Sequence, residues 1–222
     1  MSSEDKETAD WLDMKQAMYL MLGNLFYKEA DRATLDLIRQ ANLSEIGQKT
    51  YDRGLKLFLG ALETLITDEA LDDLAAQYAR IFLGAGVADE VCAFPFESVY
   101  TSPERLVAQD AYEEVYKIFK ASNFKKIDSN LFDDHLGLEL FAVAEFYGDA
   151  RAYLENGDRE KFENTQLYIA NFLRAHLLNW VPAFCEDIRR CPGGDFYRGL
   201  SYMLEGFLET EKAAYTDIPA AG

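Results

Sequence analysis

Apolar residues recur at intervals of three and four along most of the chain, which is the spacing of one face of an α-helix. Near the N-terminus this face consists of Trp11, Met14, Met18, Leu22 and Leu25. Period-two alternation is nowhere sustained, so the pattern predicts no strand. The same helical spacing predicts further helices at about 35–38, 49–65, 68–83, 102–121, 132–154, 158–180 and 196–208.

Several residues mark where these helices begin and end. Asp68, Ser102 and Asp158 are candidate N-caps, and Pro103 suits the first turn after Ser102. Gly84 is expected to end the helix at 68–83. The fold class predicted is therefore all-α, a single compact bundle of about nine to eleven helices with a long irregular loop at about 84–101.

No linker rich in proline, glycine or serine divides the chain, so residues 1–222 are expected to form a single all-helical domain. The polar stretch at 122–130 is the best candidate for an internal seam. The tail at 216–222 is small and polar, and we expect it to be disordered.

Composition and charge exclude several classes of protein. Acidic residues number 39 against 22 basic ones, a net charge of −17 that disfavours binding to nucleic acid and suits a basic partner. The longest uncharged stretches, 16–27 and 175–185, have 12 and 11 residues, so no membrane span is expected. The acidic N-terminus lacks the pattern of a secretory signal, and a cytoplasmic location is expected.

Candidate chemistry is sparse. Cys92, Cys185 and Cys191 have neither disulfide-framework nor zinc-site spacing, and no metal or cofactor is expected. His135 follows two aspartates and could serve an acid/base enzyme, or it could be a hydrogen-bonded structural histidine at a helix start. His176 lies on the apolar face of its helix, as a core or groove histidine. No nucleophile motif or phosphate loop is present, so no catalytic residue is predicted.

The loop at 94–100, Phe-Pro-Phe-Glu-Ser-Val-Tyr, concentrates three aromatic rings, a proline and a carboxylate. Such a cluster suits a groove for a peptide with apolar side chains. The alternative is a loop held on the core by its own aromatic rings. Both interpretations remain open from the residues alone.

Four segments, taken in order, resemble the TorD/DmsD/NarJ family. They are 78–84 (YARIFLG), 95–100 (PFESVY), 134–135 (DH) and 176–182 (HLLNWVP). The resemblance implies an all-helical cytoplasmic chaperone, not an enzyme, that matures molybdenum-cofactor oxidoreductases. It further implies binding of the twin-arginine leader of a precursor, which is held back from export until its cofactor has been inserted.

The resemblance also implies a leader-binding region. In physical terms, the aromatic rings of Phe82, Phe96 and Tyr100 would receive the apolar part of a leader, and the carboxylates of Glu97 and Asp134 would receive its arginines. His176 and Trp180 form a second tier. The positions that match the family motifs are Tyr78, Ile81, Phe82, Gly84, Pro95, Phe96, Ser98, Tyr100, Asp134 and His135.

The chain departs from the family pattern at two places. Leu131 and Phe132 stand where many members have Glu-Pro, and Tyr78 stands where tryptophan is frequent. Two other functions stay open: a NarJ-like chaperone that binds the body of a redox-enzyme subunit without a leader, and a small hydrolase that uses His135. Both a monomer and a homodimer are compatible with the sequence.

Overall fold

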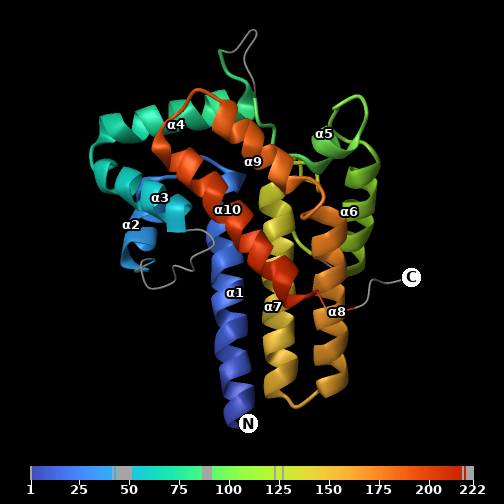
Figure 1. The fold of residues 1–222 in the computed structure, drawn as a ribbon. Coiled ribbons are helices and arrows are strands. Elements are labelled where there is room, and N and C mark those ends of the chain that lie inside the picture. The colour runs from blue at the N-terminus through green and yellow to red at the C-terminus, as the bar shows by residue number, and fades with distance from the viewer. Residues whose placement is uncertain are drawn as a thin grey trace. The chain divides into compact units, whose positions relative to one another are not determined.

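The computed structural model describes residues 2–41, 43, 52–86, 92–122, 124–126, 128–216 and 218. Within these ranges there are ten helices and no strand, only an isolated antiparallel bridge between Phe96 and His135 (Figure 1). None of the described helices is both long enough and apolar enough to cross a membrane. The helices are α1 (Ser3–Tyr27), α2 (Arg32–Gln40), α3 (Asp52–Thr64), α4 (Asp68–Leu83), α5 (Glu97–Thr101), α6 (Asp110–Ser122), α7 (Leu136–Glu155), α8 (Arg159–His176), α9 (Val181–Arg190) and α10 (Asp195–Ala214).

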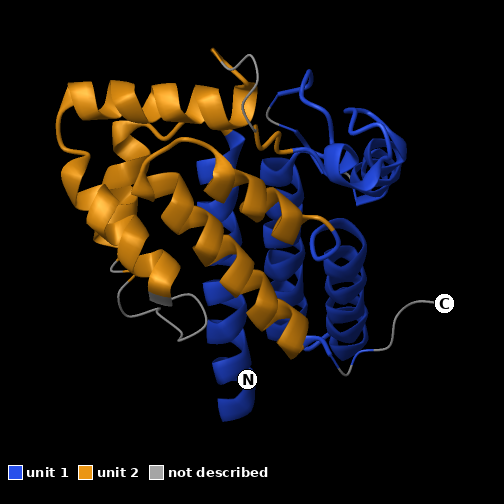
Figure 2. Cartoon of the chain, turned by 45° about the horizontal axis from the view of Figure 1, so that its top comes forward, with its two compact units in different colours: residues 1–27, 96–179, 215–222 blue, residues 28–95, 180–214 orange. Residues whose placement is uncertain are grey.

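The chain forms two compact units, each built from separate stretches of sequence (Figure 2). Unit 1 comprises residues 1–27, 96–179 and 215–222, and unit 2 comprises residues 28–95 and 180–214. The segment 122–130 lies inside unit 1, and no boundary between the units falls there. That all 222 residues behave as one domain stays a prediction, and of the tail only Thr216 and Ile218 are among the described residues.

Unit 1 is built around α7, which packs against α1 on one side and α8 on another. Helix α7 buries residues around most of its circumference, as expected of a helix inside a core. Its contact with α1 is close because glycines lie in the interface. A Cβ atom at Gly137 would lie 2.9 Å from Cα of Tyr27, and one at Gly23 would lie 2.6 Å from the ring of Phe141.

Unit 2 depends on a similar close approach between α3 and α10. A Cβ atom at Gly199 would lie 2.5 Å from the backbone nitrogen of Phe58 and 2.9 Å from the carbonyl oxygen of Gly54. The missing side chains let the two backbones touch, so that the Phe58 ring packs on that of Phe196, 4.8 Å away between ring centroids.

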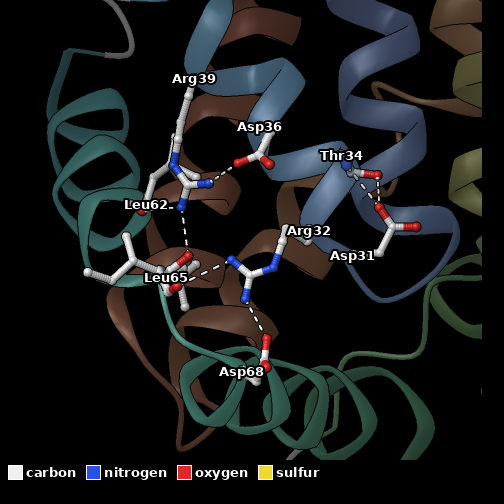
Figure 3. Close-up of polar contacts among 9 residues, drawn as sticks. Asp31, Arg32, Thr34, Asp36, Arg39, Leu62, Leu65 and Asp68 are labelled. Carbon is white, nitrogen blue, oxygen red and sulfur yellow. Dashed lines mark hydrogen bonds and ion pairs between the residues drawn. The ribbon is translucent and has the colours of Figure 1, made fainter.

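Arginines of α2 satisfy the free carbonyl groups at the end of α3 (Figure 3). Arg39 donates to the carbonyl oxygens of Leu62, at 3.0 Å, and Leu65, at 2.7 Å. Arg32 donates to the carbonyl oxygen of Ile66 and pairs with Asp68, which begins α4. The last carbonyls of a helix have no partner within it, so these bonds tie α2 to the turn between α3 and α4.

Most helices form where the periodicity places them, but three predicted details between residues 84 and 110 are wrong. The segment 84–101 is not wholly irregular, because it contains α5. Ser102 does not begin a helix: its backbone is extended, as favoured before a proline, and it ends α5 instead. Positive φ angles at Arg105 and Ala108 then delay α6 until Asp110.

Helix ends were also predicted with mixed success. Thr67, not Asp68, caps α4, since its side chain accepts a hydrogen bond from the backbone of Ala70. Asp158 caps α8, and Gly84 ends α4 in the left-handed conformation at φ 68°, both as expected. Helix α7 begins at Leu136 rather than near 132.

Replacing Gly199 by alanine should lower the free energy of unfolding by about 1–3 kcal/mol, because the new Cβ atom would meet backbone rather than a side chain able to move. Gly60→Ala in α3 is the matched control, since a Cβ atom there meets nothing within 4 Å. That control should be neutral or stabilising by up to about 1 kcal/mol. Urea unfolding curves would measure both, and equal stability of the two variants would contradict the packing described.

Candidate functional site

Asp134 is the centre of a buried polar cluster in unit 1. Its side chain is fully buried. The Oδ2 atom accepts hydrogen bonds from the hydroxyl group of Ser98 and from the backbone N–H of Ser98, the latter at 3.0 Å. The carbonyl oxygen of Asp134 accepts a hydrogen bond from the backbone N–H of Glu97, at 2.9 Å. These three bonds fix the loop that carries α5 to the start of α7.

The environment of Asp134 favours its neutral form. Burial raises the pKa of this carboxyl group and the nearby charge of Glu97 raises it further, whereas the hydrogen bonds from Ser98 favour the ionised form. The Oδ1 atom is buried and has no hydrogen-bond partner among the described residues. The Ser98 hydroxyl also accepts a hydrogen bond from the backbone N–H of Gln109, so it links the cluster to the residues just before α6.

Glu97 forms the second half of the cluster. Only 2% of its surface is exposed. Its Oε2 atom lies 3.0 Å from Nδ1 of His176, at the end of α8, and its Oε1 atom accepts a hydrogen bond from the side-chain amide of Asn179 at 3.2 Å. Both carboxylate oxygens therefore have internal partners. The contact with His176 is an ion pair when the imidazole is protonated and a hydrogen bond otherwise.

His135 acts as the N-cap of α7. Its Nδ1 atom accepts a hydrogen bond from the backbone N–H of Gly137 at 3.0 Å, which places the proton of the neutral ring on Nε2. Burial lowers the pKa of His135 from its ordinary value of 6.5 to about 3. The ring is a structural, uncharged group, and it offers neither the pKa near neutrality nor the access that an acid/base catalyst requires.

A continuous row of aromatic rings runs through His135 beside this cluster. The ring centroid of Phe96 lies 5.0 Å from that of His135, and the centroid of Tyr27 lies 6.1 Å from His135 on another side. Tyr27 in turn lies 5.7 Å from Phe141. Phe132 contacts Phe96 edge-on at 6.2 Å. Phe96 is half-buried, and Phe132 is exposed.

Tyr100 is half-buried, and the Arg105 guanidinium lies 5.4 Å from the centroid of its ring. Such an arrangement is a cation–π contact. Tyr100 is on α5, so this short helix carries a partly exposed aromatic ring paired with a guanidinium.

The other predicted residues lie in unit 2, where they form part of its core. Phe82 packs 5.0 Å from Tyr78 and 6.0 Å from Phe184, and Trp180 packs 5.5 Å from Phe184. Ile81 is buried, and its carbonyl group accepts a hydrogen bond from Ala93. Pro95 is buried and Gly84 is half-buried.

The structure thus divides the predicted residues into two groups. In unit 1 it brings together Phe96, Glu97, Ser98, Asp134, His135 and His176, and Tyr100 lies on the same short helix, α5, as Glu97 and Ser98. In unit 2 it brings together Tyr78, Phe82 and Trp180. Of all these side chains only Phe96 and Tyr100 reach the surface to a substantial extent, so most of the motif residues hold the structure together.

Three residues of the unit 1 cluster were missed by sequence reasoning. Tyr27 and Gly137 meet at the α1–α7 contact beside His135, and Asn179 donates to Glu97. Asn179 carried a usable signal, because it lies three residues after His176 and so one turn further on. Tyr27 and Gly137 carried none, because their partners are distant in sequence.

The described residues offer little reactive chemistry. They contain no group of three or more histidine, cysteine, aspartate or glutamate side chains able to hold a metal ion. Cys185 is buried, and burial raises the pKa of its thiol, which makes it unreactive. The half-buried rings of Phe96 and Tyr100 are suited to contacts with an apolar partner.

Replacing Ser98 by alanine should lower the free energy of unfolding by about 2 kcal/mol, because Asp134 loses a buried hydrogen bond and the N–H of Gln109 loses its acceptor. Ser122→Ala, which removes an exposed hydroxyl that bonds only within α6, should change it by less than about 0.5 kcal/mol. Chemical unfolding would compare them, and equal effects would mean that Ser98 does not stabilise the cluster.

The lowered pKa of His135 predicts a pH dependence of stability. Above pH 6.5 the His135 ring is neutral in both the folded and the unfolded state, so its titration does not change the free energy of unfolding. Between pH 6.5 and about 3 the unfolded chain binds a proton that the folded chain does not. The free energy of unfolding therefore decreases by about 1.4 kcal/mol for each unit by which the pH is lowered. Asparagine also caps helices well, so His135→Asn should lack this component. Unfolding measured from pH 7 to 4.5 should show the two proteins diverging, and parallel curves would refute the assignment.

Comparisons with known proteins agree with this chemistry of binding rather than catalysis. The family model described as nitrate reductase delta subunit matches residues 48–186. The chain is similar to the chaperone protein TorD of Vibrio cholerae serotype O1, with 26% identity over 215 residues that cover 90% of this chain and 92% of the relative. It is also similar to the TorD of Shewanella piezotolerans, with 25% identity and 92% and 94% coverage, and to that of Photobacterium profundum, with 28% identity and 72% coverage of each chain.

These relatives bear the names of chaperones, not of enzymes, and a hydrolase that uses His135 finds no support among them. The family model covers more than half of the chain, in the region that holds α3 to α8 and most of α9. The chain therefore belongs to the TorD/NarJ family and is a redox-enzyme maturation chaperone.

Proposed function

We propose that this chaperone acts in the cytoplasm, where it binds the twin-arginine leader of a molybdoenzyme precursor and retains the precursor until its cofactor has been inserted. The similarity to TorD chaperones over about nine-tenths of the chain carries the proposal. The net charge of −17 supports it, because an acidic protein attracts a basic peptide and repels competing polyanions.

The motif residues have separate parts in this proposal. Phe96 and Tyr100, which are half-buried, contact the apolar part of the leader. Glu97, Ser98 and Asp134 hold the loop that presents these rings, together with His135 and His176. In unit 2, we propose that the core formed by Tyr78, Ile81, Phe82 and Trp180 supports leader binding, together with Gly84 and Pro95.

A second candidate function is recognition of the body of a redox-enzyme subunit without a leader, as in NarJ-like members. One observation favours it. The carboxylates of Glu97 and Asp134, expected to receive the arginines of a leader, are buried and already accept internal hydrogen bonds. A leader would need other carboxylates, or the client would be held by another of its parts.

Calorimetric titration with twin-arginine leaders from molybdoenzyme precursors of the same organism tests the first function. One leader should bind with a dissociation constant of about 1 μM or lower, which corresponds to about −8 kcal/mol. Changing both arginines of that leader to lysine should weaken binding about tenfold or more, because the planar guanidinium binds a carboxylate through two hydrogen bonds and the ammonium group does not.

The contrary result is the absence of binding to every leader. Co-purification of a redox-enzyme subunit from which the leader has been deleted would then support the second function. Equal affinity for the arginine and lysine leaders would mean that only charge is recognised.

A further inference from the structure

Helices α1 and α7 of unit 1 leave an open hollow of about 290 Å³ on the surface. Its walls are mainly apolar, and its volume is about that of two benzene-sized groups. It is too small for a large cofactor and suits two or three side chains of a peptide. The hollow is lined by Leu20, Asn24, Phe124, Lys125, Leu138, Phe141 and Glu145.

The packing of α1 on α7 explains why the hollow exists. Gly23 has no side chain, and the Phe141 ring occupies the space that a Cβ atom there would take. The Phe141 ring forms one wall of the hollow. Leu20, three residues before Gly23 on α1, forms another wall and leaves 42% of its own surface exposed. Covering an exposed leucine beside an aromatic ring with an apolar group removes apolar surface from water, which favours binding.

Two carboxylates and one lysine lie at or near the hollow: Glu145 and Lys125 line it, and Asp149 follows Glu145 on α7. Glu145 and Asp149 lie one helical turn apart on α7, and like charges at this spacing repel each other. Partial burial raises the pKa of both carboxyl groups, and the charge of Asp149 raises that of Glu145 further. Neither carboxylate forms an ion pair within the described part of the chain, so a cation from outside would relieve both the repulsion and the loss of hydration.

The Phe141 wall of the hollow is also linked to the aromatic row of the motif cluster. Phe141 contacts Tyr27, Tyr27 contacts His135, and His135 contacts Phe96, with ring centroids 5.0 to 6.1 Å apart at each step. Because His135 is buried, these contacts run inside unit 1: they hold the Phe141 wall in place and provide no surface path from Phe96.

We propose that this hollow between α1 and α7 binds the leader, with apolar side chains against Leu20 and Phe141 and an arginine beside Glu145 and Asp149. The inference rests on the proposed function and adds the place and the contacts. Charge favours this occupant over a second copy of the chain, because the carboxylates of Glu145 and Asp149 outnumber the one lysine, Lys125, and a copy with a net charge of −17 would bring more negative charge.

Two single variants test the site against a leader that binds the wild-type protein. Leu20→Gln should weaken binding about tenfold, since an apolar contact is lost. Glu145→Gln should weaken it about fivefold for the natural leader and should leave unchanged the affinity of a leader whose arginines are both glutamine. Both positions are exposed, and unchanged thermal unfolding would verify that the variants fold.

Matched controls are chosen from residues that do not line the hollow. Leu37→Gln replaces an exposed leucine of α2, and Glu160→Gln removes an exposed carboxylate of α8. Both should bind the leader as the wild-type protein does. Isothermal calorimetry would give the affinities, and light scattering would report the molecular mass of each variant.

Each contrary outcome has a distinct meaning. If the wild-type protein binds the leader and Leu20→Gln and Glu145→Gln bind it equally well, the site is wrong and the proposed function stands. If no leader binds the wild-type protein, both are wrong. If Leu20→Gln changes the molecular mass in solution and leaves leader affinity unchanged, the hollow joins two copies of the chain and the proposed site is overturned.

Discussion

The hydrogen bonds between Ser98 and the buried side chain of Asp134 are the interaction on which unit 1 depends. They fix α5, and α5 carries Glu97 to His176 and Asn179. Beside Asp134, His135 begins α7 and contacts Tyr27 at the end of α1. Three points at which the chain leaves or enters unit 1, at residues 27, 96 and 179, are thereby held by one cluster. A buried polar cluster is stable only while its members keep their partners, so its parts depend on each other strongly.

This arrangement separates the acidic residues into two kinds. Glu97 and Asp134 are buried, accept internal hydrogen bonds and support the fold. Glu145 and Asp149 lie on the surface, partly desolvated and without an ion pair among the described residues. The buried motif residues Asp134 and Ser98 hold the loop that presents Phe96, and α7 carries the exposed carboxylates of Glu145 and Asp149.

Much of the fold could be predicted because local rules decide it. Periodicity located the long helices, and two residues marked helix ends locally: Gly84 through its left-handed backbone and Asp158 through its side-chain hydrogen bond. The errors fall where distant contacts prevail. Helix α5 has five residues, too few for a periodic signal, and it is held by Asp134, 36 residues from Ser98 in sequence. Several predicted site residues lie together in unit 1, and the burial of Glu97 and Asp134 was not foreseen, whereas their part in leader binding stays a prediction.

The sequence by itself determined the helical class, the acidity that suits a basic partner, and the motif residues that indicate the family, because these depend on residue type and short spacing. Only the tertiary structure decided that Glu97 and Asp134 face inward, that Gly23 and Gly137 let α1 lie close to α7, and that a hollow opens beside Leu20. Burial and close approach depend on which distant segments meet. Helical periodicity shows on which face of a helix a residue lies. Which residue of another element it contacts depends on how the whole unit packs.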